Sequence, residues 1–172
     1  PDITGPGVDI IAGTIDDGQT QAQHDATIAG NYTPKANATS LQGTSMSSPH
    51  VAGAAALLRQ QHPTWSPAAI KSALMTTTTV VKLANGSTDT NRWGYGAGHM
   101  NPNGAAAPSL VYDTSPADYG RFLCGLALTP PAGIGSCTTL GSVAAQNLNL
   151  PSITAASVPG SMSIARKVTN VS

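Results

Sequence analysis

The chain has 172 residues, and its eight basic and eight acidic residues give a formal net charge of zero. Charged residues make up only 9% of the sequence and form no run of one sign, so the charge pattern indicates neither a nucleic-acid nor an acidic-membrane partner. The longest apolar stretch, near residues 51–58, is far shorter than the roughly 18 residues that indicate a membrane span. This length suits one domain with a core, or a domain plus part of another, and nothing here indicates an oligomeric state.

The first predicted element is a short buried strand within residues 1–13. The segment "PDITGPGVDIIAG" contains a β-branched apolar run bounded by Pro and Gly, which is typical of such a strand. Ile10 and Ile11 are expected in the core. From Thr14 to Gln42 the apolar pattern gives way to Gln, Asp, Asn and Thr, and this composition predicts a surface loop.

A buried helix is predicted over residues 46–60. Apolar residues recur there at helical spacing, with almost no polar residue before Arg59. Pro49 is expected in the first turn, where its missing N–H costs little, so Ser45 is placed at the helix start. The predicted inner face consists of Val51, Ala54, Ala55 and Leu58.

A second helix carries clearer local signals. Ser66 is a typical N-cap, Pro67 suits the first helical position, and Trp65 is placed to pack against Ile70. The threonines at 76–79 are poor helix formers and are expected to end it. Its predicted inner face consists of Ile70, Ala73 and Leu74.

The rest of the chain changes character twice. The Gly- and Asn-rich segment 91–106 predicts a structured turn region, and residues 118–126 predict one short helix. After Gln146, "LNLPSI" and "SMSIARKV" are typical of strands in an all-β unit. Because two strands cannot form a stable sandwich, residues 147–172 are expected to be the start of a truncated domain, and residues 1–146 the part before it.

Two further features favour a secretory route. Cys124 and Cys137 flank a loop containing Gly and Pro, outside any CxxC or Cys/His pattern suited to zinc, and we expect them to form a disulfide. Glycosylation sequons that fall in polar stretches begin at Asn31, Asn37, Asn85 and Asn170. The protein is therefore expected to be secreted and extracellular, although Ser and Thr are so common here that each sequon alone is weak support.

Ser45, in the segment "GTSMSSPHVAG" at residues 43–53, has two readings. Ser45 or Thr44 can simply cap the helix, as Ser and Thr often do. Alternatively, Gly43 allows a tight turn, and a serine at the start of a buried helix has amide donors and the positive end of the helix dipole beside it. An oxyanion site requires such hydrogen-bond donors and such a positive field beside the reacting oxygen. The segment lacks the GxSxG pattern of lipases and esterases.

The segment "GTSMSSPHVAG" resembles the nucleophile motif of the subtilisin-like serine proteases. "PDITGPGVDI" resembles the family's sequence before this serine, and "HPTWSPAAIKSALMTT" and "YGAGHMNP" resemble the sequence after it. "LVYDTSPADYGRFLCGL" and "LNLPSITAASVPGSMSIARKVTNV" are similar to plant-type subtilases, in which the latter begins a fibronectin III-like domain. The resemblance covers nearly the whole chain apart from residues 14–42.

This resemblance implies a fold and a set of site residues. The fold would be α/β, a partial subtilisin-like domain with a parallel sheet and packed helices, followed by the first strands of an incomplete β-sandwich. Ser45 would be the nucleophile, and its amide would be one oxyanion donor. Thr44 matches a supporting position, and Met46 matches a methionine beside the nucleophile, although ordinary packing explains it equally well. His50 matches a helix residue that is not the catalytic base.

The sequence also departs from the family pattern. The catalytic Asp and His and the oxyanion Asn precede the serine in this family, and their usual settings are absent from residues 1–44. Asp16 or Asp17 followed by His24 would satisfy the order alone, but neither setting resembles the family motifs, so we interpret them as solvated loop residues. The two histidines after the serine, His62 and His99, are expected to be structural.

The predicted function is therefore that of a serine endopeptidase acting on protein or peptide substrates by acyl-enzyme chemistry at Ser45. The Asp, His and Asn are expected to lie upstream of Pro1, so the chain alone is predicted to be inactive. No residue requires a metal or an organic cofactor. The alternatives are a non-catalytic truncated subtilase that acts as a binding or decoy surface, and a glycosylated adhesion module, which leaves the serine motif unexplained.

Overall fold

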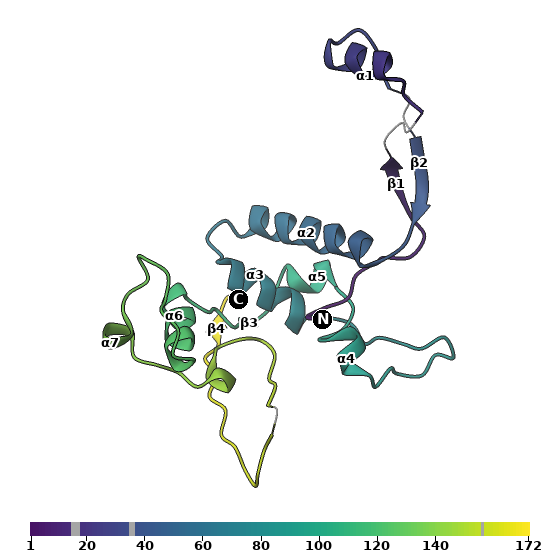
Figure 1. Ribbon diagram of the computed structural model, residues 1–172. Coiled ribbons are helices and arrows are strands. Elements are labelled where there is room, and N and C mark those ends of the chain that lie inside the picture. The colour runs from purple at the N-terminus through teal and green to yellow at the C-terminus, as the bar shows by residue number, and fades with distance from the viewer. Residues whose placement is uncertain (15–17, 35–36, 156) are drawn as a thin grey trace. The chain divides into compact units, whose positions relative to one another are not determined.

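The computed structural model describes residues 1–14, 18–34, 37–155 and 157–172 (Figure 1). The chain divides into two compact units, one of residues 5–50 and one of residues 1–4 and 51–172. The elements in chain order are β1 (Ile10–Thr14), α1 (Gln21–Ile28), β2 (Asn37–Leu41), α2 (Thr44–Gln61), α3 (Pro67–Thr76), α4 (Arg92–Tyr95), α5 (Pro102–Ala105), β3 (Leu110–Val111), α6 (Pro116–Gly125), α7 (Cys137–Leu140), the 3-10 helix η1 (Ala145–Asn147) and β4 (Thr169–Asn170).

The unit of residues 5–50 contains an antiparallel pair of strands. β1 pairs with β2 in a register that opposes Ile10 to Leu41. The expectation of a loop over residues 14–42 was wrong for two segments, since α1 and β2 both fall within it. The loop prediction missed α1 because its apolar content is low, but Thr20 and Gln23 form a capping box that satisfies the first amides of this helix. Asp16 and Asp17 lie outside the described residues.

The prediction that Ile10 and Ile11 lie in the core is wrong, since neither belongs to the core cluster of the described residues. Ile10 is half-buried, whereas Ile11 is 79% exposed. Successive side chains of a strand point to opposite faces of the sheet, and the described residues supply no layer that covers the Ile11 face of this two-stranded sheet. An apolar β-branched run therefore did not suffice to place either isoleucine in a core.

Helix α2 begins two residues earlier than predicted and is buried on one face only. Ala54 and Leu58 are buried, but Leu57, on the other face, is 65% exposed. The inner face was thus predicted correctly, and the description of the whole helix as buried was wrong. Because α2 begins at Thr44, Pro49 lies inside the helix beyond the first turn, where it removes a hydrogen bond to the carbonyl of Ser45.

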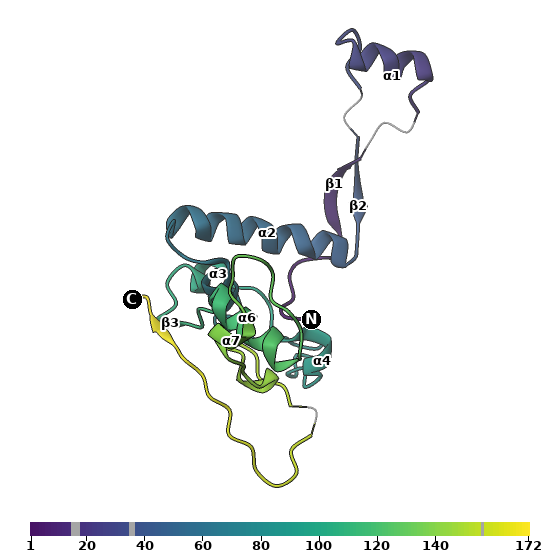
Figure 2. The same ribbon diagram turned by 60° about the vertical axis from the view of Figure 1, so that its left-hand side comes forward.

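The core of the unit formed by residues 1–4 and 51–172 is centred on α3. The part of α2 from Val51 onward lies beside α3 in both views (Figures 1 and 2). The predicted capping of α3 is confirmed, because the Ser66 hydroxyl accepts from the amide of Ala69 at 3.0 Å and Pro67 is the first helical residue. The buried core residues are Ala54, Leu58, Ala69, Ile70, Ala73, Leu74, Ala105 and Val111.

The strands expected after Gln146 do not form at the predicted places. Within residues 148–155 and 157–168 no strand is present, and β4 pairs instead with β3 in an antiparallel sheet. Side chains replace the backbone ladder here: Asn149 donates to the Lys167 carbonyl at 2.9 Å and accepts from the Lys167 amide at 2.8 Å. Both sheets in the described residues are antiparallel. The parallel sheet and the β-sandwich therefore stay predictions.

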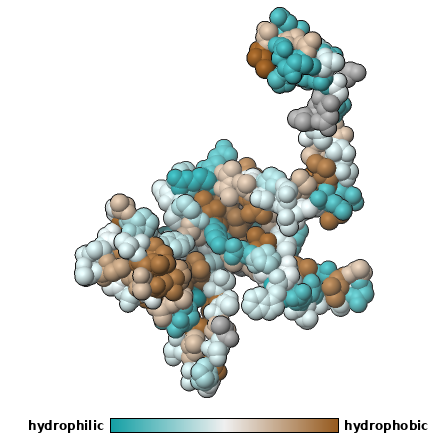
Figure 3. Space-filling view, in the orientation of Figure 1, coloured by the Kyte–Doolittle hydropathy of each residue, from teal (hydrophilic) through white to brown (hydrophobic). Residues whose placement is uncertain are grey.

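Helix α6 and the disulfide belong to the same unit but lie outside its core cluster. Apolar surface gathers over α6 (Figure 3). The disulfide between Cys124 and Cys137 is confirmed, with their Cα atoms 5.5 Å apart. α6 starts with a capping box between Ser115 and Asp118. Burial alone would raise the pKa of the Asp118 carboxyl, but hydrogen bonds from Ser115 and Arg121, with the charge of Arg121, lower this pKa below its ordinary value.

No helix within the described ranges is both long enough and apolar enough to cross a membrane.

Candidate functional site

Ser45 is the second residue of α2, and its side chain is exposed. The turn before it depends on Gly43, whose φ of 140° is one that L side chains rarely adopt. The Gly43 carbonyl accepts from the amides of Met46 at 3.0 Å and Ser47 at 3.3 Å, and so begins the hydrogen bonding of the helix. The expected placement of Ser45 at the start of this helix agrees with the structure.

The first turn of α2 offers hydrogen-bond donors beside Ser45. The earliest amides of a helix have no carbonyl partner within it, and here these include the amides of Thr44 and Ser45. The first turn of this helix, all of which is described, carries no acidic side chain that would neutralise the positive end of the helix dipole. An oxygen that develops negative charge next to the Ser45 hydroxyl would therefore meet a favourable field.

The segment of residues 5–7 lies directly against this helix start, within the same compact unit. The Gly43 amide donates to the Gly7 carbonyl at 2.8 Å, and the Ser47 hydroxyl donates to the Gly5 carbonyl at 2.7 Å. A Cβ on Gly7 would lie 2.3 Å from the Ser47 hydroxyl oxygen, so only glycine fits there. The sequence reasoning did not select Ser47 or Gly7, and the sole hint was the pair of glycines around Pro6.

The other residues of the motif are placed as follows. Thr44 is exposed and Met46 is half-buried. His50 lies in α2, and its Nδ1 atom is 2.7 Å from the Met46 carbonyl. Because a carbonyl only accepts hydrogen bonds, Nδ1 must carry the proton and donate it. This contact keeps the ring against its own helix, as expected for a residue that is not the catalytic base.

The three remaining histidines all have local contacts. His24 lies in α1 rather than in a loop, is exposed, and has its Nδ1 atom 3.7 Å from the Asp25 carboxylate. The His62 Nε2 atom donates to the Ala106 carbonyl at 2.8 Å, and His99 exchanges backbone hydrogen bonds with Thr79. The contacts of His62 and His99 are structural, as expected.

The sequon asparagines are all exposed, and they are Asn31, Asn37, Asn85 and Asn170. Two of them hold the acceptor residue of their own sequon in a local turn. Asn85 accepts from the Ser87 hydroxyl at 2.7 Å, and Asn170 accepts from the Ser172 hydroxyl at 2.7 Å. Exposure therefore permits modification at each of these positions.

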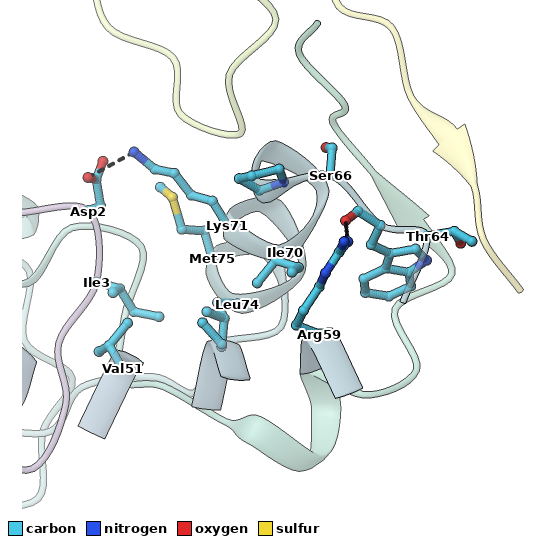
Figure 4. A pocket seen from close by; sticks show the side chains of 13 residues that line it. Asp2, Ile3, Val51, Arg59, Thr64, Ser66, Ile70, Lys71, Leu74 and Met75 are labelled. Atoms are coloured by element: carbon cyan, nitrogen blue, oxygen red, sulfur yellow. Dashed lines mark hydrogen bonds and ion pairs between the residues drawn. The ribbon is translucent and has the colours of Figure 1, made fainter. Parts of the chain in front are cut away.

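An apolar groove of about 810 Å³ lies between α2 and α3 in the second unit (Figure 4). Its walls are aliphatic and aromatic, and its rim carries Lys71, paired with Asp2 at 3.0 Å, and Arg59, which donates to the Trp65 carbonyl. The lining residues are Asp2, Ile3, Val51, Ala55, Arg59, Thr64, Trp65, Ser66, Pro67, Ile70, Lys71, Leu74 and Met75. Among the residues that the structure describes, no three His, Cys, Asp or Glu side chains are grouped to hold a metal ion.

An exposed serine at the start of a long helix, beside amides that have no partner within that helix, has the groups that a nucleophile and one oxyanion donor require. The model of the subtilase family matches residues 1–96, which is more than half of the chain and includes the whole motif around Ser45. The chain belongs to the subtilase family, and the names of its relatives support a serine-type peptidase family.

Curated relatives match nearly the whole chain. Subtilisin-like protease SBT2.5 of Arabidopsis thaliana is 37% identical over 192 residues, which cover 99% of this chain and 22% of that protein. Subtilisin-like protease SBT1.6 of the same plant is 41% identical over 169 residues, covering 90% of this chain and 21% of that protein. A subtilisin-like protease of Glycine max is 40% identical over 185 residues, covering 99% and 23%. The chain thus spans less than a quarter of the length of these relatives.

Proposed function

We propose that this chain carries the nucleophile of a serine endopeptidase that cleaves protein or peptide substrates. The Ser45 hydroxyl attacks the carbonyl carbon of the scissile bond, a histidine takes its proton, and the amine leaves with a proton from that histidine. The Ser45 amide donates to the oxyanion of the tetrahedral intermediate. Water then hydrolyses the acyl-enzyme. Thr44 supports the oxyanion site, and Met46 packs beside the nucleophile.

The observation that carries this proposal is the combination at the start of α2. The Ser45 side chain is exposed, while the amides of Thr44 and Ser45 lack partners within the helix. A serine that served only as a cap would be expected to accept from an amide two or three residues further on, as Ser66 does in α3. At α2 the Gly43 carbonyl already accepts from Met46 and Ser47.

Under the same proposal, the 172-residue chain has no peptidase activity by itself. We place the catalytic Asp, the catalytic His and the side-chain oxyanion Asn in parts of the protein outside residues 1–172. A serine hydroxyl without a base is a weak nucleophile, and in subtilisin itself the loss of triad members costs on the order of 10⁴ to 10⁶ in rate. Neither a metal nor an organic cofactor is part of this reaction.

Hydrolysis of a fluorogenic peptide tests this proposal. The full-length protein is expected to cleave the peptide, its Ser45→Ala variant to lose on the order of a thousandfold or more in kcat, and the matched Ser48→Ala variant to keep full activity. The 172-residue chain is expected to show no cleavage. Hydrolysis by the 172-residue chain that Ser45→Ala abolishes would contradict the inactivity of the fragment, and a folded but inactive full-length protein would favour the non-catalytic binding role.

The proposal extends to the remainder of the protein. Residues 1–146 would form the C-terminal part of an α/β subtilisin-like domain with a parallel sheet. Residues 147–172 would begin a fibronectin III-like β-sandwich. Secretion would place the protein in an oxidising compartment that maintains the disulfide between Cys124 and Cys137. Glycans would be carried by Asn31, Asn37, Asn85 and Asn170. Enzymatic deglycosylation of the secreted protein, followed by mass spectrometry of these peptides, would test the glycan sites one by one.

A further inference from the structure

The first turn of α2 is tied to residues 5–7 on both sides of Ser45. On one side, the Gly43 amide donates to the Gly7 carbonyl at 2.8 Å. On the other side, the Ser47 hydroxyl donates to the Gly5 carbonyl at 2.7 Å, across 42 positions of sequence. Ser45 lies midway between these two anchors. Its own side chain is exposed, whereas Ser47, Gly5 and Gly7 are half-buried.

The fit between Gly7 and the helix is tight. A Cβ at Gly7 would lie 2.3 Å from the Ser47 hydroxyl oxygen and 2.9 Å from the Gly43 carbonyl oxygen. Both distances are shorter than real Cβ contacts, so the Ser47 hydroxyl occupies the space that a side chain at position 7 would fill. The hydrogen bond from Ser47 is therefore part of a close backbone approach that a larger residue at Gly7 would prevent.

The helix needs such an anchor at this turn. Proline has no N–H, so Pro49 cannot donate to the carbonyl of Ser45, four residues before it. The turn that contains Ser45 thus has one backbone hydrogen bond fewer than an ordinary helical turn. Contacts from outside the helix then have a larger share in fixing the orientation of this turn.

We propose that Ser47 is a positioning residue for Ser45: by donating to the Gly5 carbonyl, it fixes the direction in which the Ser45 hydroxyl and amide project. This inference rests on the proposed function of Ser45. Ser47 touches no reacting atom. Its effect arises because a small displacement of a nucleophile from its attack geometry costs rate out of proportion to the contact that is lost.

Kinetics of the full-length protein test the positioning role. After titration of active sites with a fluorophosphonate, Ser47→Ala is expected to lower kcat per titrated site about tenfold with KM unchanged. Ser47→Thr retains the hydroxyl and is expected to restore kcat to within about threefold of the wild type. The matched control is Ser48→Ala, the same change one residue further on at an exposed position, with wild-type kcat. A merely structural role would reduce the number of titrated sites and leave kcat per site unchanged, which would overturn the inference.

Amide hydrogen exchange of the 172-residue chain tests the anchor without any activity. Ser47→Ala is expected to speed exchange at the amides of Gly43, Met46 and Ser47 about tenfold, while Ser48→Ala leaves them unchanged. Unchanged exchange in Ser47→Ala would overturn the inference. If exchange responds as expected but Ser45→Ala keeps peptidase activity, the proposed function of Ser45 fails and the positioning role fails with it. If Ser45→Ala is inactive and Ser47→Ala has wild-type kcat, only the positioning role fails.

Discussion

Two adjacent leucines of α2 offer a direct test of how this helix packs. Leu58 is 2% exposed and belongs to the core with α3, whereas Leu57 is 65% exposed on the other face. The same substitution, Leu→Ala, can be made at both positions. Since the two residues share a helix and a chemical change, only their burial differs.

The expected magnitudes follow from burial. Removing a buried leucine side chain loses its transfer free energy and leaves a cavity, so Leu58→Ala is expected to lower the free energy of unfolding by about 3 kcal/mol. At the exposed Leu57, the change is expected to stay within about 0.5 kcal/mol, because little apolar area is lost and alanine favours a helix slightly more than leucine. For a chain of this length, about 3 kcal/mol corresponds to a decrease in Tm of roughly 6 to 12 °C.

Urea denaturation of the 172-residue chain, followed by circular dichroism, would measure both variants. The decisive quantity is the difference between the two free energies of unfolding, since it cancels effects common to any leucine in this helix. Equal losses from Leu57→Ala and Leu58→Ala would refute the reasoning, because they would show that α2 presents both faces to a packed core.

Three further outcomes are expected. Folding lowers the pKa of the Asp118 carboxyl below its ordinary value of 3.8. The stability that this carboxylate contributes is therefore present above pH 3.8 and is lost as the pH falls through the lower folded pKa. Urea titrations at several pH values should find Asp118→Asn less stable than the wild type at pH 7 and equal to it at the acid end. Replacing Cys124 and Cys137 by serine opens a loop with a sequence separation of 13 and is expected to cost about 3 kcal/mol in the free energy of unfolding, measured in urea; no loss would contradict the disulfide's contribution. Ser66→Ala removes the cap on Ala69 and should lower the thermal midpoint in calorimetry by an amount equivalent to about 1 kcal/mol, with Ser66→Gly milder.

Local signals were enough to predict α3, and the short helix predicted over residues 118–126 is found as α6 at Pro116–Gly125. Ser66 and Pro67 specify the start of α3 within a few residues of sequence, and the threonines that follow the helix specify its end. The inner face of α2 was equally accessible, because the spacing of Val51, Ala54 and Leu58 reflects helical geometry alone. Each of these predictions depended on residues close together in the chain.

Features that depend on distant residues were missed. β2 is the polar segment Asn37–Leu41, which becomes a strand by pairing with β1 rather than through its own apolar pattern. The anchor from Ser47 to Gly5 joins residues 42 positions apart and leaves no periodic trace in the sequence. Conversely, the segment 161–168 has the alternation of apolar and polar residues that is typical of a strand. In the described residues its backbone bonds to the side chains of Asn149 and Asn147 rather than to another strand.

The candidate nucleophile could be selected because its motif is contiguous. Gly43, Ser45 and the small residues that follow lie within one segment, and the structure places that segment at the start of a helix, as expected. A catalytic base could not be selected, since a triad is defined by geometry in space and not by sequence order. Sequence order alone would offer His24, which was rejected because its setting does not resemble the family motif; the structure places it in α1, with its Nδ1 atom 3.7 Å from the Asp25 carboxylate.

Covalent labelling tests the central claim most directly. A fluorophosphonate reacts with an activated serine, and tryptic mass spectrometry of the labelled full-length protein reports which hydroxyl carries the phosphonyl group. The adduct is expected on Ser45, with no adduct in Ser45→Ala and an unchanged yield in Ser48→Ala. Stoichiometric labelling of any other residue, or labelling that survives Ser45→Ala, would contradict the assignment of Ser45 as the nucleophile.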